Sequence, residues 1–438
     1  MRRSGTACAP PSRSRPASTS PPWPTIRRRT LTSLPEDRMT NPASLSFPIV
    51  DLDQHYYEPD DCCTRHLEVK FADRAVHIRT DEKERRSWFA GDRPLTFDRR
   101  PLDYVLEPGD LRRLMAERSG GGVTEPRVIA SNADPAFRDR DARLEKLDAF
   151  GVEACVMFSS FFFENEFLED AAGCFANLRA YNRWVEEDWG FAYRDRLFAP
   201  ASLSLLDLGL ALEELERVLA AGARLVMLRT GPFAGRSPAD PHFDPFWARV
   251  EEAGVPVVLH VSLSTYETEI SRIWGEPVNS EMGTFSAFQW FTTFMHRPIV
   301  DTMASLVFNN LFGRFPGLKV LSIENGSAWL PQLMRDLDHV MHYTQDSTRW
   351  LGGKPDALPS EILREHLYVS PFYEPYYEAP MADLIDAIGI DRLIFGSDWP
   401  HGEGKVAPVD YLADLEGIGE ADAERFLRGN GARLLGLA

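Results

Sequence analysis

The stretch DPFWARVEEAGVPVVLHVS (residues 244–262) carries the pattern that decides the fold. Its first part, residues 244–254, has the apolar spacing of an amphipathic helix and ends in Gly254, a common helix terminator. Residues 255–262 form a short apolar run with a histidine near its end, which predicts a buried strand. Another apolar run, RLVMLRT at 224–230, precedes the helix, so this region is predicted to be a strand–helix–strand unit. Strands joined in this way pair in parallel through a right-handed crossover.

The alternation of strand and helix extends from this unit in both directions. Eight apolar runs are predicted strands, each followed by helix, at 47–53, 153–159, 196–203, 224–230, 255–262, 318–324, 366–372 and 392–399. Near-continuous apolar runs are expected for strands that are covered on both faces. A Rossmann-type sheet would need a glycine-rich turn after the first strand, and DLDQHYYEP (51–59) contains no glycine. The predicted fold class is therefore α/β, a (β/α)8 TIM barrel.

Two regions depart from the barrel pattern. Residues 1–45 are predicted to be a disordered basic tail, because residues 1–38 hold eight Arg, seven Pro and six Ser without apolar periodicity. The tail is interpreted as plain disorder or as an upstream extension with the real start at Met39; the alternatives are an organellar transit peptide and a nucleic-acid-binding arm. Residues 46–438 are predicted to form the barrel domain, with an insertion after the first strand at about 60–135.

Composition excludes several classes of protein. A net charge of −18 argues against nucleic-acid binding, which needs a basic face. The sequence contains no uninterrupted apolar run of the ~18 residues that a transmembrane helix needs, so no membrane association is expected. The five cysteines form no CxxC pair and no disulfide framework, which favours a reducing, cytoplasmic setting. The long helical stretch predicted at 283–313 is a candidate homodimer face.

Ionisable residues gather at the predicted strand ends, where a barrel carries its chemistry. Asp53 and His55 follow the first strand on one face, His260 ends the fifth, Glu324 the sixth and Asp398 the eighth. Each residue also has a structural interpretation, such as a hydrogen-bonded core histidine or a capping carboxylate. Imidazoles and carboxylates that converge on one rim suit one divalent cation with N and O ligands, such as Zn²⁺, Mn²⁺ or Fe²⁺.

Several blocks resemble the amidohydrolase-2 branch of the amidohydrolase superfamily, which includes aminocarboxymuconate-semialdehyde and resorcylate decarboxylases. The blocks are DLDQHYYEP (51–59), HFDPFWARVEEAGVPVVLH (242–260), FPGLKVLSIENGSAWLPQLMRDLD (315–338), RLIFGSDWPHGEG (392–404) and the closing GNGARLLGL (429–437). The resemblance implies a barrel that holds one divalent metal ion. The ligands that it implies are Asp53, His55, His260 and Asp398.

The sequence departs from this family's pattern at two positions. Asp53 and His55 form Asp-x-His where many relatives have His-x-His, which hardens the site and weakens the case for zinc. Glu324 stands where decarboxylase relatives carry a catalytic histidine. Binuclear members use a carboxylated lysine on the fourth strand, and RLVMLRT (224–230) has no lysine, so one metal ion is expected.

The first functional hypothesis is a metal-dependent carboxy-lyase (decarboxylase) that releases CO₂ from a small aromatic or unsaturated carboxylic acid. Asp398 would be both ligand and proton shuttle, and Glu324 would be a second base or would hold a partner behind the ligands. Arg229 would pair with the substrate carboxylate, its alternative being a buried structural ion pair.

The second hypothesis is a metal-dependent hydrolase of an amide, lactone or ester that uses a metal-bound hydroxide. The third is a catalytically inactive barrel that acts as a binding protein. The expected cofactor is one Zn²⁺ or Mn²⁺ ion, and the expected partner is a small-molecule carboxylate or carbonyl substrate.

Overall fold

The computed structural model of the chain describes most of the sequence after the tail. The described residues are 45–82, 86–95, 102–119, 122, 125–161, 170–261, 266–278, 284–294, 296–371, 381–415 and 418–437. They all belong to the unit that spans residues 40–438. The predicted disordered tail, residues 1–45, lies outside the described residues except at its last position.

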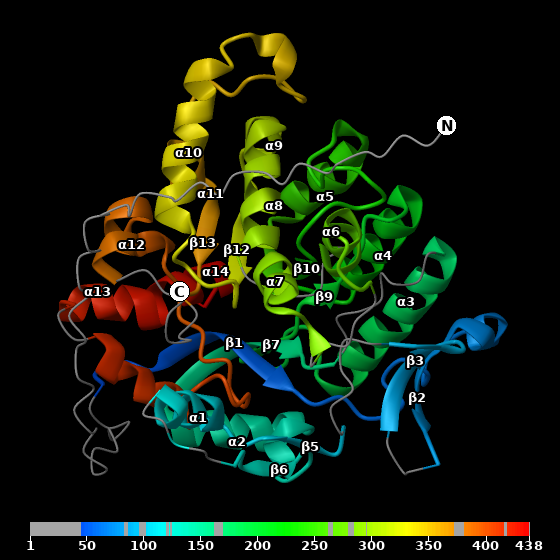
Figure 1. Cartoon of the computed structure of the whole chain (residues 1–438). Coiled ribbons are helices and arrows are strands. Elements are labelled where there is room, and N and C mark those ends of the chain that lie inside the picture. The colour runs from blue at the N-terminus through cyan, green and yellow to red at the C-terminus, as the bar shows by residue number, and fades with distance from the viewer. Residues whose placement is uncertain are drawn as a thin grey trace, which may run out of the picture. The chain divides into compact units, whose positions relative to one another are not determined.

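Parallel strands form the centre of this unit, which confirms the α/β class (Figure 1). One sheet has the order β1-β7-β8 and the other β13-β12-β11-β10-β9, with parallel pairing throughout both. The strands are β1 (Ile49–Tyr56), β7 (Val152–Ser159), β8 (Leu197–Phe198), β9 (Ala201–Ser202), β10 (Val226–Leu228), β11 (Val257–His260), β12 (Val320–Ile323) and β13 (Leu367–Val369). The third predicted strand is thus divided into β8 and β9, which belong to different sheets.

The last predicted strand, 392–399, was wrong as a regular element. The 3-10 turn η9 (Ile390–Arg392) begins this region, and residues 393–398 adopt no regular secondary structure. Its backbone is still bonded on both sides, because Ile394 N donates to the β13 carbonyl of Val369 (3.0 Å) and Leu52 N in β1 donates to Phe395 O (2.8 Å).

The irregularity has a local cause at the end of this segment. Ser397 N and Asp398 N both donate to the same carbonyl, Asp53 O, at 3.2 and 2.8 Å, so the regular ladder is interrupted. Asp398 also has a φ of 58°, which ends the extended backbone. The segment therefore lies between β13 and β1 without being a strand.

Helices surround the parallel strands, and neighbouring helices pack against one another (Figure 1). They are α2 (Arg140–Phe150), α3 (Ala171–Asp188), α4 (Leu208–Ala220), α5 (Asp244–Ala253), α6 (Tyr266–Trp274), α7 (Ala287–Gln289), the π-helix η7 (Trp290–Phe294), α8 (Arg297–Phe308), α9 (Leu311–Arg314), α10 (Leu330–Tyr343), α11 (Pro359–His366), α12 (Met381–Ile388), α13 (Glu420–Glu424) and α14 (Asn430–Leu435). Aspartates cap several of them; the Asp139 carboxylate accepts from Ala142 N at the start of α2. The homodimer face predicted at 283–313 spans α7 to α9 and stays a prediction. Among the described helices, none has the combined length and apolarity that a membrane crossing requires.

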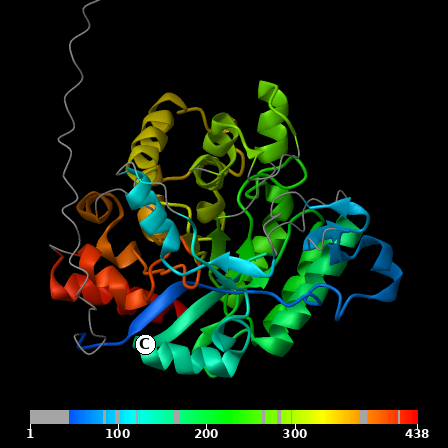
Figure 2. The ribbon, with the colours of Figure 1, turned by 60° about the horizontal axis from the view of Figure 1, so that its bottom comes forward.

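Small antiparallel sheets occupy the chain between β1 and α2. One contains β2 (Val76–Thr80), β3 (Arg86–Ala90) and β4 (Arg93–Pro94), and another pairs β5 (Tyr104–Leu106) with β6 (Val128–Ala130). Helix α1 (Asp110–Ser119) lies between β5 and β6 in the sequence. Leu111 N donates to Gly402 O (3.0 Å), which ties α1 to the loop that follows Asp398 (Figure 2, cyan and orange).

Candidate metal centre

Five of the predicted site residues meet at one end of the parallel strands. Asp53 and His55 lie in β1, His260 is the last residue of β11, Glu324 directly follows β12, and Asp398 lies in the segment beside β1. The Nε2 atom of His55 is 3.4 Å from Asp53 Oδ1, 3.5 Å from Glu324 Oε2 and 3.3 Å from Asp398 Oδ1. The Nε2 atom of His260 is 3.6 Å from Asp53 Oδ1 and 3.1 Å from Glu324 Oε2.

Backbone carbonyls orient both histidine rings. His55 Nδ1 lies 2.9 Å from Ser159 O, and His260 Nδ1 lies 2.8 Å from Val261 O. A carbonyl can only accept, so in both rings Nδ1 carries the hydrogen and donates it. In the neutral imidazole, the lone pair of Nε2 then faces the cluster, which is the arrangement that a metal-binding histidine needs.

The backbone at two of these positions is unusual. Glu324 and Asp398 have φ angles of 57° and 58°, a left-handed conformation that is rare for residues other than glycine and that concentrates at functional sites. Gly396 allows the last segment to approach β1, because a Cβ there would lie 2.5 Å from Asp53 Cβ and 2.6 Å from Ser370 Oγ. The site is therefore assembled by close backbone approach as well as by side chains.

Burial and mutual charge shift the pKa values in the cluster. Burial, together with the Glu324 charge, raises the pKa of Asp398 well above its usual range. Burial alone would raise the pKa of Glu324, but its contacts with His260 and His55 outweigh that effect and hold the pKa below its usual value. Burial alone would lower the pKa of His260, but Asp53 and Glu324 outweigh it and raise the pKa to about 10.

The cluster has the chemistry and the spacing of a site for one divalent ion. Asp53 Oδ1, His55 Nε2, Glu324 Oε2 and Asp398 Oδ2 are buried and have no hydrogen-bond partner among the described residues. Such atoms are costly unless something compensates them. Ligand atoms at about 2.1 Å from a shared ion lie about 3.0–3.4 Å apart at octahedral or tetrahedral angles. The observed separations of 3.1–3.6 Å are close to this range, so one ion could bind Asp53, His55, His260 and Glu324 together. Asp398 belongs to an overlapping group that shares His55 and Glu324 with the first.

His401 belongs to the same cluster, although the sequence reasoning assigned it no role. Its Nδ1 lies 2.8 Å from Asp398 Oδ1, its Nε2 lies 2.9 Å from Ser160 Oγ, and its ring stacks on His55 with 3.9 Å between centroids. The signal available in the sequence was the histidine three residues after Asp398 in DWPH.

Glu58 supports the site from behind His55. Its carboxylate accepts from Ser159 Oγ (2.5 Å), Ser160 N (3.3 Å) and Phe161 N (3.2 Å). These bonds fix the turn after β7, which carries both the carbonyl that accepts from His55 and the hydroxyl that contacts His401.

The sixth predicted residue, Arg229, anchors the loop after β10. Its guanidinium donates to Thr230 O (2.9 Å) and Pro232 O (2.6 Å) and lies over the Phe233 ring, 4.4 Å from its centre. Its pairing with a substrate carboxylate stays a prediction.

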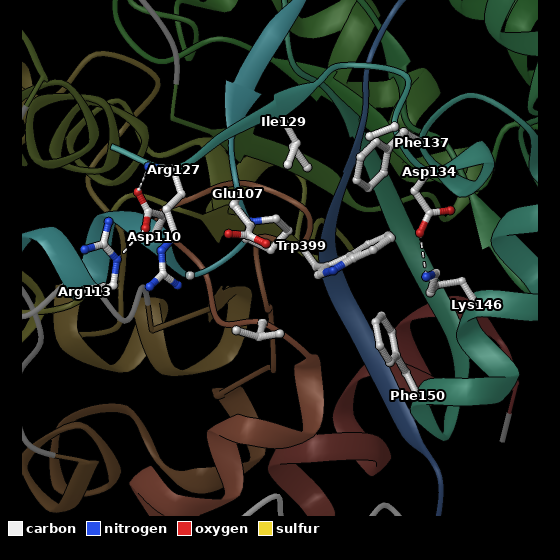
Figure 3. Close-up of a pocket in the computed structure, with 14 residues that line it drawn as sticks. Glu107, Asp110, Arg113, Arg127, Ile129, Asp134, Phe137, Lys146, Phe150 and Trp399 are labelled. Atoms are coloured by element: carbon white, nitrogen blue, oxygen red, sulfur yellow. Dashed lines mark hydrogen bonds and ion pairs between the residues drawn. The ribbon is translucent and has the colours of Figure 1, made fainter. Parts of the chain in front are cut away.

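A cavity of about 590 Å³ is lined in part by Trp399, the residue that follows Asp398 (Figure 3). The Asp398 carboxylate contacts His55 in the cluster. The Trp399 indole instead packs between Phe137 and Phe150, with ring centroids 5.6 and 5.3 Å away. The charged lining of the cavity includes the Lys146–Asp134 ion pair (2.5 Å). The cavity lining includes none of the five cluster residues, so the cavity is separate from the cluster.

Comparison with known proteins gives consistent relationships. The amidohydrolase family model matches residues 167–437. A gamma-resorcylate decarboxylase of Rhizobium sp. (strain MTP-10005) is 26% identical over 319 residues, which cover 68% of this chain and 87% of that protein. The crystal structure of an amidohydrolase from Mycobacterium avium subsp. paratuberculosis K-10 is 36% identical, with a TM-score of 0.80 over 90% of this chain and 100% of that one. The fold is also similar to that of a dihydroxybenzoic acid decarboxylase from Polaromonas sp. JS666 with bound manganese, at 19% identity, a TM-score of 0.57, and coverage of 89% and 97%.

Proposed function

The chain belongs to the amidohydrolase family, and on that premise we propose that it is a metal-dependent decarboxylase of a small aromatic or unsaturated carboxylic acid. The decarboxylase relatives indicate an enzyme. The observation that carries the proposal is the cluster of buried carboxylate and imidazole groups whose atoms lie at the spacing of metal ligands.

We assign the ligand roles to Asp53, His55, His260 and Asp398, and we add Glu324 because its Oε2 lies within 3.5 Å of both imidazoles. Carboxylate oxygens favour hard cations, so the donor set suits Mn²⁺ better than Zn²⁺. The manganese in the Polaromonas decarboxylase supports this choice.

When bound, a divalent cation supplies positive charge that offsets the charge of the substrate carboxylate and holds it in place. Asp398 and His401 are joined by a 2.8 Å contact and hold a proton beside the cluster, while Ser160 fixes the far nitrogen of His401. Asp398 delivers this proton to the substrate carbon that carries the carboxylate. The electron pair of the broken carbon–carbon bond stays on that carbon, and the carboxylate departs as CO₂.

The same proposal includes a closed (β/α)8 barrel within residues 46–438, with the insertion at about 60–135. Two features support closure. Only two residues separate β8 from β9, so the chain passes directly from one sheet to the other. At the other end, residues 393–398 bond to both β13 and β1.

The test uses chelator-treated protein reloaded with Mn²⁺ or Zn²⁺. The substrates are 2,6-dihydroxybenzoate and other hydroxybenzoates labelled with ¹³C in the carboxyl group, and a panel of lactones and amides in H₂¹⁸O. We expect ¹³CO₂ release, and a loss of about 10²-fold or more in Asp398→Asn. Asp207→Asn is the matched control, because Asp207 caps α4 by accepting from Leu210 N.

Two other outcomes would overturn the proposal. Incorporation of ¹⁸O into a lactone or amide product without CO₂ release would identify a hydrolase built on the same residues. The carboxylate of Glu324 in place of the expected histidine is the observation that favours this second candidate. If the purified protein bound neither Mn²⁺ nor Zn²⁺, this result would instead support the hypothesis of a catalytically inactive barrel that acts as a binding protein.

A further inference from the structure

Arg143 in α2 is a fully buried cation beside the metal centre. Its Nη2 donates to His55 O (2.6 Å), its Nη1 to Gln54 Oε1 (3.0 Å) and its Nε to Ala136 O (2.7 Å). The guanidinium also lies over the Trp399 ring, 4.6 Å from its centre. These acceptors are uncharged, and a buried charge satisfied only by neutral groups is an expensive arrangement. Arg143 therefore contacts two of the chain segments that carry candidate ligands, β1 and the segment that contains Asp398 and Trp399.

The bond to Gln54 fixes the direction of a longer relay. Because Gln54 Oε1 accepts from Arg143, its Nε2 must face Asp51, where it donates to Oδ2 at 2.8 Å. Asp51 Oδ2 also accepts from Ser397 Oγ (2.6 Å). Asp51 Oδ1 accepts from Asp53 N (3.2 Å) and Ser397 N (2.9 Å). All four bonds of Asp51 lie within or next to β1 and the Asp398 segment.

We propose that Arg143, acting through Gln54 and Asp51, is a positioning residue that sets where Asp53, His55 and Asp398 stand in the metal centre. This inference rests on the proposed function, because it assumes that these three residues bind the ion. Each backbone group in the relay belongs to a ligand residue or to its neighbour, so movement of the relay moves the ligands.

The planar guanidinium suits this task. It directs several donors at fixed angles, whereas a lysine ammonium at the same place is a flexible point charge. Metal ligands must stand within about 0.2 Å of their ideal distances, so a small change in the framework weakens binding. The contact of the guanidinium with the Trp399 ring also links Arg143 to the segment that carries Asp398.

The experiment measures Mn²⁺ binding to chelator-treated protein by titration calorimetry, without substrate. We expect Arg143→Lys and Arg143→Met to bind Mn²⁺ about 10- to 100-fold more weakly than the parent, the usual effect of losing a partner behind the ligands. Arg217→Met is the matched control: Arg217 on α4 is a partly buried arginine that bonds to Glu214 and Glu186, so its loss tests stability without touching the relay. Urea unfolding of each metal-free variant reports its stability separately.

A second pair of variants tests the relay itself. In Asp51→Asn, one carboxylate oxygen becomes an NH₂ group, which donates a hydrogen bond and needs an acceptor. The Gln54 amide could accept from this NH₂ group only by turning its oxygen toward residue 51. It cannot do so while Arg143 donates to that oxygen. In the double variant Asp51→Asn/Arg143→Met, Gln54 is released and can turn. If the two substitutions acted independently, their losses of Mn²⁺ affinity would multiply. We expect the double variant to bind Mn²⁺ at least about threefold more tightly than this independent case predicts.

The outcomes separate this inference from the proposed function. If the parent protein fails to bind Mn²⁺, the metal centre itself is wrong. If the parent binds Mn²⁺ but Arg143→Lys and Arg143→Met bind it equally well, the positioning role is refuted while the metal centre stands. Losses that multiply in the double variant would refute the relay through Gln54.

Discussion

Raising the pH is expected to destabilise the metal-free protein through His260. This imidazole is buried against Asp53 and Glu324, which raise its pKa to about 10. In the unfolded chain its pKa is about 6.5. Between these values the folded state holds a proton that the unfolded state has released, so the unfolding free energy falls as the pH rises. The contribution is complete below about pH 6.5 and disappears as the pH passes 10.

The pKa difference sets the size of the effect. At about 1.36 kcal/mol per pKa unit, the upper limit for His260 is about 5 kcal/mol. His55 acts in the same direction, because contacts with Asp53 and Glu324 outweigh its burial and raise its pKa. This is a large part of the 5–15 kcal/mol that is typical of folded proteins. Bound Mn²⁺ needs neutral imidazoles, so the loaded protein is expected to lose this dependence or reverse it.

Urea unfolding between pH 6.5 and 9.5, with chelator and then with Mn²⁺, measures the effect. We expect His260→Gln to reduce the slope in the metal-free protein. His366→Gln is the control, because His366 is a buried histidine on α11 whose Nδ1 donates to Leu318 O and which lies outside the cluster. A flat profile for the parent protein, or an unchanged slope in His260→Gln, would refute the reasoning.

Other consequences of the same geometry can be measured directly. Glu324→Gln is expected to weaken Mn²⁺ binding at least about tenfold in calorimetry, since it removes a charged ligand; unchanged affinity would return Glu324 to the role of a base. Gly396→Ala is expected to lower the unfolding free energy by about 1–3 kcal/mol, because the added carbon meets Asp53 and Ser370, and wild-type stability would contradict that contact. His401→Gln is expected to slow CO₂ release by about 10²-fold while Mn²⁺ affinity stays within about tenfold, and a larger loss of affinity would make His401 a ligand. Mn²⁺ binding near pH 7.5 is expected to release protons, seen as a calorimetric enthalpy that varies with the ionisation enthalpy of the buffer; an enthalpy that is the same in every buffer would show that the imidazoles are already neutral.

The parts of the structure that local patterns determine were predictable from the sequence. The runs at 153–159 and 255–262 are strands because they are short, apolar and covered on both faces, and the structure confirms them as β7 and β11. Parallel pairing then places all the strand ends on one side, which is why His260, Glu324 and Asp398 were expected to lie together. Composition and period were sufficient for this step.

Other features depend on contacts between distant segments, which a strand pattern does not contain. The apolar run before Asp398 resembles a strand, but the bonds of Ser397 and Asp398 to a single carbonyl of β1 interrupt it. In the sequence, Arg143 is one of several charged residues of a predicted helix. In the structure it is fully buried, because β1 and Trp399 cover it. His401 was overlooked because its link to Asp398 depends on the turn between them.

The charge of the ligand set connects the metal centre to the reaction. Asp53, Glu324 and Asp398 would together carry three negative charges if all were ionised, which exceeds the two positive charges of the ion and would repel an anionic carboxylate. In the metal-free site, burial and the Glu324 charge raise the pKa of Asp398 and favour its protonated form. If Asp398 keeps this proton when the ion binds, the loaded site is neutral and Asp398 can supply the proton that replaces CO₂. A neutral amide or lactone carries no charge for an ionised Asp398 to repel. A hydrolase of such a substrate therefore does not need a protonated Asp398 for substrate binding. The affinity for an inert aromatic carboxylate should therefore fall as Asp398 ionises at higher pH, whereas the affinity for its neutral amide should not.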